Sequence, residues 1–390
     1  MRRLEEVDIA GKRILVRADY NVELDSGSGI IDDNRVRKSL PTLKYILEHG
    51  GKAILMSHLG DPEDGERGEF SLHPVAEKLS ELMQLPVKFC PECVGPQADS
   101  AVASLKTGEI LLLENLRFNP GEKKNSPEFA AQLAKHADVF INDSFASSHR
   151  QHASMVGVPK CVKEKAAGLL MQQEWDYYNS KILNPKRPIC LIMGGIKVSA
   201  KLPALVNLAH KVDKLIVGGA MANTFLAAQG LQMGRSFIEP DLFVKSLEIL
   251  ATLARRDCKL YLPVDFLVAP SPGSRGLARA VPALEVPADS MALDIGPATS
   301  LLFKEAVHSA ETIIWDGPMG ACEHDDFSKG TYDLVEHLAS AHGIVAACGG
   351  QTELVIRKME LSHKFDYIST GGTSFLELFQ GKTPPAVTAL

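Results

Sequence analysis

The chain has 390 residues, of which 45% are apolar and 23% are charged, a composition typical of a folded globular protein and not of a disordered one. This length exceeds what one hydrophobic core usually supports, so we expect two domains. The formal net charge of −6, from 42 basic and 48 acidic residues, argues against nonspecific binding to nucleic acid or to anionic membranes. Any anion site must therefore be a local cluster of Arg and Lys.

No apolar stretch approaches the ~18 residues of a membrane span, and the first segment, "MRRLEEVDIAGK", has acidic residues where a signal peptide would be apolar. The seven cysteines, an odd number scattered through both halves, fit a reducing compartment better than a disulfide framework. We therefore expect a cytoplasmic protein without a membrane partner or a nucleic-acid partner.

Short apolar runs typical of buried strands alternate with amphipathic, helix-like stretches along the whole chain. The first half contains the runs "RILVRADYN", "AILMSHLG", "EILLLENLRF" and "DVFINDSF". Between the first two of these, "SLPTLKYILEHGG" predicts a helix with Ser39 as its N-cap, Pro41 in its first turn and a glycine pair at its end.

The second half continues the pattern with "ICLIMGGIK", "LIVGGAMAN", "LYLPVDFLVA", "MALDIGP", "TIIWDGPMG", "IVAACGGQT" and "FDYISTGG". This alternation predicts an α/β protein with parallel sheets that are covered by helices on both faces. The boundary is expected in "KEKAAGLLMQQEWDYYNSKILNPKRP", whose helical stretch ends at Asn184 and Pro185. We therefore predict two doubly wound, Rossmann-like domains that are joined by a hinge helix.

The predicted strand ends of the first half carry polar and charged side chains. They are Arg17, Asp19, Asn21, His58, Asn115, Arg117, Asn142 and Asp143, and Arg150 follows in "SSHRQH". In parallel α/β sheets, ligands bind outside the carboxyl ends of the strands. Arginine, asparagine and histidine side chains suit a small anion whose oxygens accept hydrogen bonds. By itself, His58 would fit a structural histidine equally well, and Arg35 would fit a solvated helix residue.

The predicted strand ends of the second half carry glycine pairs instead. They are Gly194 with Gly195, Gly218 with Gly219, Gly349 with Gly350, and Gly371 with Gly372, and Lys197 and Lys201 follow the first pair. Glycine lets backbone N–H groups approach a phosphate, and a helix N-terminus adds a partial positive charge. One such pair would indicate only a tight turn, but four pairs predict a nucleotide site although no P-loop motif is present. Two anionic ligands on two domains suggest group transfer.

The chain resembles the phosphoglycerate kinase family from end to end. The resemblance lies in "RADYNVEL", "DDNRVRKSLPT", "SHLGDP", "LLLENLRFNPGEKKN", "DSFASSHRQHAS", "GGIKVSAKL", "KVDKLIVGGAMANTFLAAQG", "LPVDFLVA", "LDIGPAT", "TIIWDGPMGACE", "CGGQTE" and "ISTGGTSFLELFQGK". It implies phosphoryl transfer between 1,3-bisphosphoglycerate and ADP, which gives 3-phosphoglycerate and ATP, with Mg²⁺ on the nucleotide. It also implies a monomer that binds these two substrates.

The resemblance further implies roles for individual residues. Asp19, Asn21 and His58 would hold the glycerate, and Arg35, Arg117 and Arg150 would take its phosphate or the transferring group. The nucleotide would contact Lys197, Lys201, Pro318, Glu323, Thr352 and the glycines at 194, 195, 218, 219, 349, 350, 371 and 372, with Glu323 on the ribose. The implied domains are residues 1–166 with 373–390 for the phosphoglycerate and 167–372 for the nucleotide. Arg35 and Lys197 are our candidates for catalytic residues.

The sequence departs from the family pattern at two positions with a functional role. Asp61 stands where the family usually has an arginine on the substrate phosphate. A unit negative charge ~6 Å from another, at an effective dielectric constant of ~20, would cost roughly 3 kcal/mol of substrate-binding free energy. Alternatively, the loop turns Asp61 outward towards Arg67. Gln351 stands where the family usually has an aspartate that binds the nucleotide's magnesium, and Glu353 is a candidate substitute.

Two interpretations follow. The first is an active phosphoglycerate kinase with altered substrate and metal contacts, because the arginines at 35, 117 and 150 and both lysines are present. The second is a weakly active or inactive relative that binds nucleotides or anions in a regulatory role.

Overall fold

The computed structural model describes residues 1–25, 27, 29–63 and 67–390, which form two compact units. Unit 1 comprises Met1–Asn179 and Lys382–Leu390, and unit 2 comprises Ser180–Gly381. These limits differ from the predicted domains in two segments. Helix α7 (Leu169–Tyr177) packs on α1 and β6 in unit 1, and helix α14 (Gly372–Phe379) packs on α8 in unit 2.

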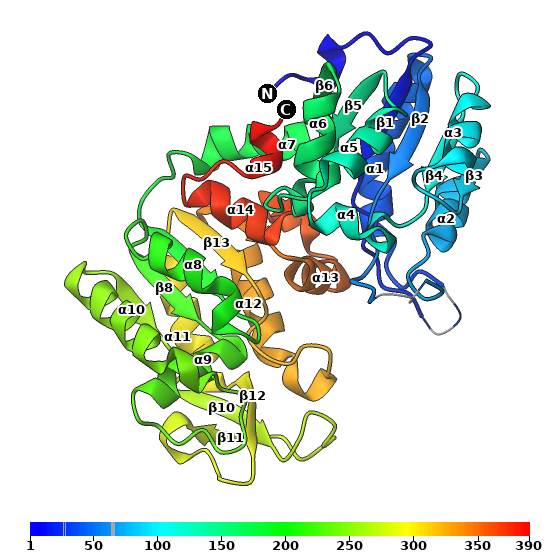
Figure 1. Ribbon diagram of the computed structural model, residues 1–390. Coiled ribbons are helices and arrows are strands. Elements are labelled where there is room, and N and C mark those ends of the chain that lie inside the picture. The colour runs from blue at the N-terminus through cyan, green and yellow to red at the C-terminus, as the bar shows by residue number, and fades with distance from the viewer. Residues whose placement is uncertain (26, 28, 64–66) are drawn as a thin grey trace. The chain divides into compact units, whose positions relative to one another are not determined.

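Unit 1 contains one sheet of six parallel strands in the order β3-β4-β2-β1-β5-β6, with helices on both faces (Figure 1). The strands are β1 (Arg13–Arg17), β2 (Lys52–Met56), β3 (Val87–Cys90), β4 (Ile110–Leu113), β5 (Val139–Asn142) and β6 (Glu164–Ala167). Besides α7, the helices are α1 (Asn34–Glu48), α2 (His73–Met83), α3 (Pro96–Ala103), α4 (Pro120–Lys123), α5 (Pro127–Ala134), α6 (Val158–Cys161) and α15 (Pro385–Thr388).

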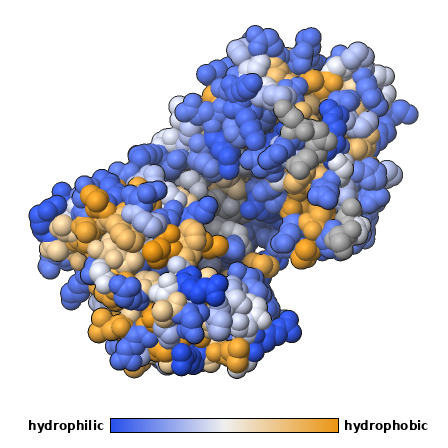
Figure 2. All heavy atoms as spheres, turned by 60° about the horizontal axis from the view of Figure 1, so that its bottom comes forward, coloured by the Kyte–Doolittle hydropathy of each residue, from blue (hydrophilic) through white to orange (hydrophobic). Residues whose placement is uncertain are grey.

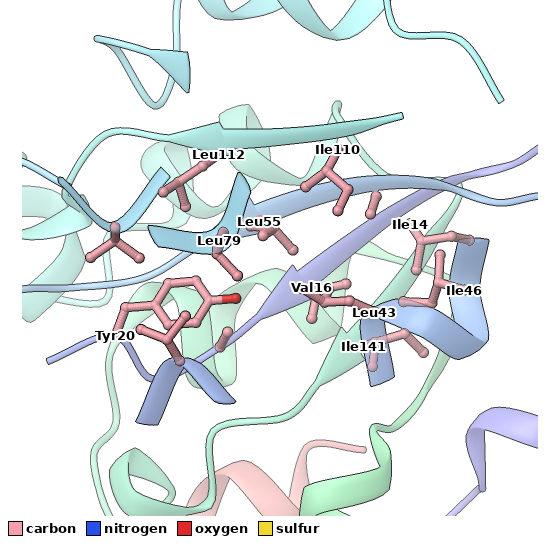
Figure 3. Packing of buried hydrophobic residues seen from close by; sticks show 14 of the residues in the cluster. Ile14, Val16, Tyr20, Leu43, Ile46, Leu55, Leu79, Ile110, Leu112 and Ile141 are labelled. Carbon is pink, nitrogen blue, oxygen red and sulfur yellow. The ribbon is translucent and has the colours of Figure 1, made fainter. Parts of the chain in front are cut away.

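Apolar side chains on the two faces of this sheet build two buried clusters. Ile14 and Val16 of β1 lie in one cluster with Leu43 of α1 and Leu79 of α2 (Figure 3). Leu15, between them in the chain, lies in the cluster on the opposite face, because successive side chains of a strand point to opposite faces. The sheet is therefore buried on both sides, as its continuous apolar strands predict.

Helix α1 begins at Asn34, five residues before the predicted N-cap. Ser39 lies in its second turn, where the hydroxyl donates to the carbonyl of Val36 at 2.8 Å, and Pro41 lies inside the helix. The prediction of Ser39 as N-cap is therefore wrong. The fully buried Val36 gives the upstream turn an apolar contact with the core that favours the longer helix, and this extension places Arg35 in its first turn.

Unit 2 also contains a sheet of six parallel strands, in the order β15-β14-β13-β7-β8-β9 (Figure 1). The strands are β7 (Ile189–Met193), β8 (Lys214–Val217), β9 (Lys259–Tyr261), β13 (Thr312–Asp316), β14 (Ile344–Cys348) and β15 (Tyr367–Ser369). Besides α14, the helices are α8 (Val198–Leu208), α9 (Gly219–Ala228), α10 (Phe243–Arg255), α11 (Pro297–His308), α12 (Lys329–Ala339) and α13 (Gly350–Lys358). Both parallel sheets of the predicted fold are thus confirmed.

A second, three-stranded sheet in unit 2 was not predicted. It is antiparallel, with the order β11-β10-β12, and consists of β10 (Asp265–Ala269), β11 (Arg279–Pro282) and β12 (Met291–Ile295). The run "LYLPVDFLVA" divides between β9 and β10, and "MALDIGP" forms β12. The segments that join these three strands contain no α-helix, and without a crossover helix neighbouring strands pair antiparallel.

The surface of unit 2 shows apolar residues at several places (Figure 2). Val244 and Leu247 of α10 are exposed, and so are Ile196 and Phe237. Singly exposed apolar residues are ordinary on soluble proteins, so only those beside a cavity bear on function. Among the residues that the structure describes, no helix is both long enough and apolar enough to cross a bilayer.

Candidate active site

The carboxyl ends of β1, β2 and β4 bring the predicted anion-binding side chains of unit 1 to one edge of the sheet. Asp19 and Arg35 form an ion pair, with Oδ2 and Nη1 2.5 Å apart. Burial opposes ionisation of Asp19, but Arg35, His58 and Arg17 outweigh it and hold the pKa of this carboxyl below its ordinary value. The other oxygen of Asp19 accepts from the backbone N–H of Asn21 at 3.1 Å.

His58 is held by Arg17, which was predicted as a strand-end residue without an individual role. An Nη2 nitrogen of Arg17 lies 3.0 Å from Nδ1 of His58. Because guanidinium can only donate, Nδ1 must accept, so the ring proton of neutral His58 lies on Nε2. Burial and the charge of Arg17 hold the pKa of His58 well below its ordinary value. Arg17 is itself buried, and its Nε donates to the hydroxyl of Ser154 at 3.0 Å.

The loop after β2 carries a short hydrogen-bond frame. The side-chain oxygen of Asn21 accepts from the N–H of Gly60 at 2.8 Å, and Arg117 donates to the carbonyl of Gly60. Asn115 donates to the carbonyls of Leu59 and Phe70 at 2.7 and 2.9 Å. Asn21 and Arg117 therefore fix this loop at the edge of the sheet, and Asn115 has a structural role.

Asp143 also has a structural role. Its carboxylate accepts from the N–H groups of Leu170 and Met171, at 2.9 and 3.3 Å, in the first turn of α7. Burial raises the pKa of this carboxyl to about 6. A buried strand-end aspartate can thus cap a helix instead of facing a ligand, which the sequence pattern alone does not distinguish.

Asp61 faces the cationic side chains. Its Oδ1 lies 3.6 Å from Nη1 of Arg117 and contacts the ammonium group of Lys123. Arg67, the alternative partner that the sequence suggested, instead pairs with Glu92 at 3.6 Å. The structure therefore pairs Asp61 with Arg117 and Lys123 and not with Arg67.

Positive charge is concentrated around this edge. Burial and the charge of Arg150 lower the pKa values of His149 and His152 to about 4 in each case, and Arg117 and Arg17 act on His152 in the same direction. Burial also lowers the pKa of Arg117, and Arg150 adds to that effect. Arg150 is exposed. We refer to Arg17, Arg35, Arg117, Arg150 and Lys123, together with the neutral His58, as the cationic cluster.

In unit 2, four helices follow strands of the parallel sheet after loops of one to four residues: α8 after β7, α9 after β8, α13 after β14 and α14 after β15. Their N-terminal N–H groups lie at the carboxyl edge of this sheet, which favours phosphate groups. Lys197 is exposed at the N-cap position of α8. Lys201, in the same helix, donates to the carbonyl of Asp316 at 2.8 Å and forms an ion pair with its carboxylate at 2.9 Å.

Several of the predicted glycines allow loop backbones to touch. A Cβ atom on Gly194 would lie 2.1 Å from the carbonyl oxygen of Pro318, and one on Gly219 would lie 2.5 Å from the nitrogen of Gly195. A Cβ on Gly218 would lie 2.3 Å from the sulfur of Met319. Gly195 differs, because a Cβ there would meet only the Lys201 ammonium group, at 3.9 Å. Gly195 is thus the member of this set with room for a ligand.

A cavity lies beside these loops. Five of the predicted residues line it, namely Gly195, Gly219, Pro318, Glu323 and Gln351, and the apolar side chains of Ile196, Phe237, Met291 and Leu293 contribute to its wall. The apolar wall was not predicted, because Phe237 lies in a loop and Met291 and Leu293 lie in the unpredicted antiparallel sheet. Asp294 also lines the cavity, and burial raises its pKa to about 7.

Apart from Gln351, the predicted residues that follow β14 and β15 lie outside the described lining of the cavity. The hydroxyl of Thr352 accepts from the N–H of Gly317 at 2.8 Å, and a Cβ on Gly349 would lie 2.6 Å from the carboxylate of Asp316. Gly350 and Gly372 begin α13 and α14, and Gly371 donates to the hydroxyl of Ser369 at 3.1 Å. These residues support the loops beside the cavity.

The two units together define an α/β protein that has a cationic cluster at one sheet edge and a glycine-rich, partly apolar cavity at another. The model of the phosphoglycerate kinase family matches residues 4–382, so the chain belongs to this family. The chain is 47% identical to the phosphoglycerate kinase of Desulfotalea psychrophila, over the full length of both, and 43% identical to that of Aquifex aeolicus, over 100% of the chain and 98% of the relative.

Solved structures agree. The phosphoglycerate kinase structure from Coxiella burnetii has a TM-score of 0.81 and 35% identity, over 99% of this chain and 98% of the other. That from Pyrococcus horikoshii has a TM-score of 0.85 and 29% identity, over 100% and 98%. The chain is therefore a kinase that transfers a phosphoryl group reversibly between 1,3-bisphosphoglycerate and ADP, giving 3-phosphoglycerate and ATP. Nothing in these comparisons favours an inactive relative.

Proposed function

We propose that the cationic cluster of unit 1 binds the phosphoglycerate and that the cavity of unit 2 binds the nucleotide as its magnesium complex. The observation that supports the first assignment is the gathering of the cationic cluster at one sheet edge, where Arg117 and Lys123 already hold the carboxylate of Asp61. The lowered pKa values of His58, His149, His152 and Arg117 agree with it. Burial and neighbouring positive charges disfavour the protonated form of each of these groups, and a bound phosphate or carboxylate would relieve this repulsion.

Each side chain has a role that its contacts suggest. The Nε2–H group of His58 is oriented by Arg17 and can donate to a glycerate oxygen, while Asp19 can accept from a hydroxyl group. Asn21 holds the adjoining loop. Arg117 and Arg150 suit the phosphate because guanidinium matches the geometry of its oxygens.

The cavity of unit 2 suits a nucleotide because its wall has both apolar and polar parts. Ile196 and Phe237 offer apolar surface to a base, and Glu323 offers a carboxylate to the ribose hydroxyls. The helix N-termini, Gly195 and Lys201 lie where phosphates would follow. A mostly apolar cavity with a few polar groups is the usual form of a nucleotide-sized site.

The phosphoryl transfer requires charge neutralisation more than acid–base catalysis. In the direction that consumes ATP the nucleophile is a carboxylate, whose unperturbed pKa of ~4 leaves it ionised near neutral pH, so no general base is needed. What remains is in-line positioning and neutralisation of the charge on the transferring phosphoryl oxygens. We propose Arg35 and Lys197 for this neutralisation.

The donors near the cavity fit a magnesium ion that is held mainly by the nucleotide. Among the described residues, no group of three His, Cys, Asp or Glu side chains could bind a metal on its own. Gln351 lines the cavity, and Glu353 follows it in the first turn of α13. Mg²⁺ commonly takes one or two protein oxygens together with water and substrate phosphates, which these side chains can complete. When bound, the ion would neutralise nucleotide phosphate charge.

Exchange of Gln351 for aspartate is expected to lower the magnesium concentration for half-maximal rate several-fold, because a carboxylate adds charge to a neutral oxygen donor. The measurement is a magnesium titration of the rate at fixed ATP. Glu353→Gln is the companion variant, and it should raise the required magnesium if Glu353 supplies the charge instead. An unchanged magnesium dependence in both variants would remove this turn from the metal site.

A pair of charge-removing variants tests the division of the two ligands. Arg150→Met should weaken the binding of 3-phosphoglycerate at least tenfold and leave MgATP binding unchanged, because a charge-assisted hydrogen bond contributes ~1.5–3 kcal/mol. Lys201→Met should show the reverse. Isothermal titration calorimetry with each ligand measures both, and equal losses for both ligands in either variant would contradict the assignment.

A further inference from the structure

Asp61 places a carboxylate oxygen between two cations of unit 1. Its Oδ1 lies 3.6 Å from Nη1 of Arg117 and contacts the Nζ of Lys123. The three side chains come from three separate segments: the loop after β2, the end of α4 and the short helix η2 (Leu116–Phe118) after β4. A negatively charged oxygen is thus already held by an arginine that the proposed function assigns to the phosphate of the substrate.

Lys123 belongs to this cluster by position as well as by this contact. The neighbouring residue Glu122 is buried, and its carboxylate accepts from the N–H and the hydroxyl of Ser154 at 2.9 and 2.6 Å. The same hydroxyl accepts from Nε of Arg17 at 3.0 Å. The turn that carries Lys123 is therefore connected through Ser154 to the buried arginine that holds His58.

The charge of Lys123 acts on the same space. It adds to the effects of Arg150, Arg117 and Arg17 on His152, whose pKa is lowered first by burial. Lys124, one residue further on, is the exposed C-cap residue of α4, whereas Lys123 contacts Asp61. The two adjacent lysines thus have different surroundings.

We infer that Lys123 is a further binding residue for the phosphate group of the substrate and that Asp61 is its counterion in the unliganded protein. On binding, a phosphate oxygen takes the place of the Asp61 carboxylate between Lys123 and Arg117. The exchange is favourable because a phosphate carries more negative charge than one carboxylate. Asp61 is 65% exposed and can turn into solvent, and an exposed ion pair is weak. This assignment rests on the proposed function of the cationic cluster.

Asp61 is then a competitor of the substrate phosphate, and the arginine missing from position 61 has a replacement in Lys123. The two residues should therefore have opposite effects on affinity. Removing the ammonium group removes a ligand of the phosphate, whereas removing the charge of Asp61 removes its competitor. An ordinary surface ion pair predicts neither effect.

The test is calorimetric titration of the full-length protein with 3-phosphoglycerate. Lys123→Met should weaken binding about tenfold, Lys123→Arg should retain most of the affinity, and Asp61→Asn should tighten binding at least about threefold. Lys124→Met is the matched control, because it changes the net charge by the same amount as Lys123→Met. Its affinity for 3-phosphoglycerate should stay within about twofold of that of the unmodified protein. MgATP affinity and the thermal unfolding temperature confirm that each variant is folded.

A Lys123→Met variant that behaves like Lys124→Met would overturn the role of Lys123. An Asp61→Asn variant with unchanged affinity would overturn the role of Asp61. Arg117→Met separates these failures from failure of the proposed function. If Arg117→Met weakens binding strongly while Lys123→Met does not, only the present inference fails. If neither variant weakens binding, the cationic cluster is not the substrate site.

Discussion

Replacement of Arg35 by alanine is expected to lower kcat by roughly a hundredfold or more, since arginines that neutralise transferring phosphoryl charge contribute ~10³–10⁵ in related reactions. Arg35 lies in the first turn of α1 and is a third exposed, so its guanidinium can reach a ligand. Its present partner, Asp19, keeps its hydrogen bond from Asn21 in the variant. The fold should therefore survive, and steady-state assays with 3-phosphoglycerate and MgATP measure the loss.

Arg37→Ala is the matched control for this prediction. Arg37 belongs to the same helix but is more than half exposed and pairs with Asp33 one turn away, at 2.8 Å. Such exposed pairs contribute little to stability, and the acidic neighbours of Arg37 are Asp33 and Glu81. Its kcat should remain within a factor of about two. If Arg35→Ala were equally mild, Arg35 would be a structural partner of Asp19 and not a catalytic residue.

The sequence patterns predicted the elements that local periodicity encodes. The inner parallel strands of unit 1, β1, β2, β4 and β5, are short apolar runs that are almost fully buried, and each was predicted as a strand. The edge strands β3 and β6 were not predicted, because they carry charged residues and are partly exposed. Local patterns did not predict which strands pair with one another. The "LYLPVDFLVA" run was treated as one strand, but its two halves join different sheets, and nothing within the run indicates which strand either half will meet.

The candidate site shows the same limit. The residue types and their positions along the chain indicated Arg117 and His58 as site residues. The contacts of a side chain, however, depend on segments that are distant in sequence. Arg17 is apparent as a strand-end residue, yet its orientation towards His58 depends on how β1 and β2 pair. Likewise, the contact of Asp61 with Lys123 joins residues 62 positions apart in sequence, and Asp143 caps α7 although its position resembles that of Asp19.

The same glycine pattern can have two different structural reasons. The glycine pairs were interpreted as room for phosphate, but at Gly194 the small residue permits contact between two backbones. The N–H of Gly194 donates to the carbonyl of Asp316, and that of Gly195 donates to the carbonyl of Pro318, each at 2.9 Å. The loop after β7 is thus bonded to the loop after β13, and this contact shapes the wall of the cavity that Gly195 and Pro318 line.

Gly194→Ala should therefore weaken MgATP binding by roughly ten- to a hundredfold, because forcing extra volume into a well-packed region costs ~1–3 kcal/mol. The φ angle of Gly194 is not positive, so alanine tests close approach alone. The added methyl group would lie 2.1 Å from the carbonyl oxygen of Pro318, and either loop must shift to admit it. Affinity for 3-phosphoglycerate should stay unchanged, because its proposed site lies in unit 1.

Gly273→Ala is the control for this substitution. Gly273 is also in unit 2, but an added Cβ would meet no heavy atom within 4 Å, and its φ angle is not positive either. Nucleotide affinity and thermal unfolding should therefore match those of the unmodified protein. Calorimetry with MgATP on both variants isolates the effect of the loop contact. If Gly194→Ala bound MgATP as tightly as Gly273→Ala, the two loops would yield without altering the cavity, and the contact between them would not shape the nucleotide site.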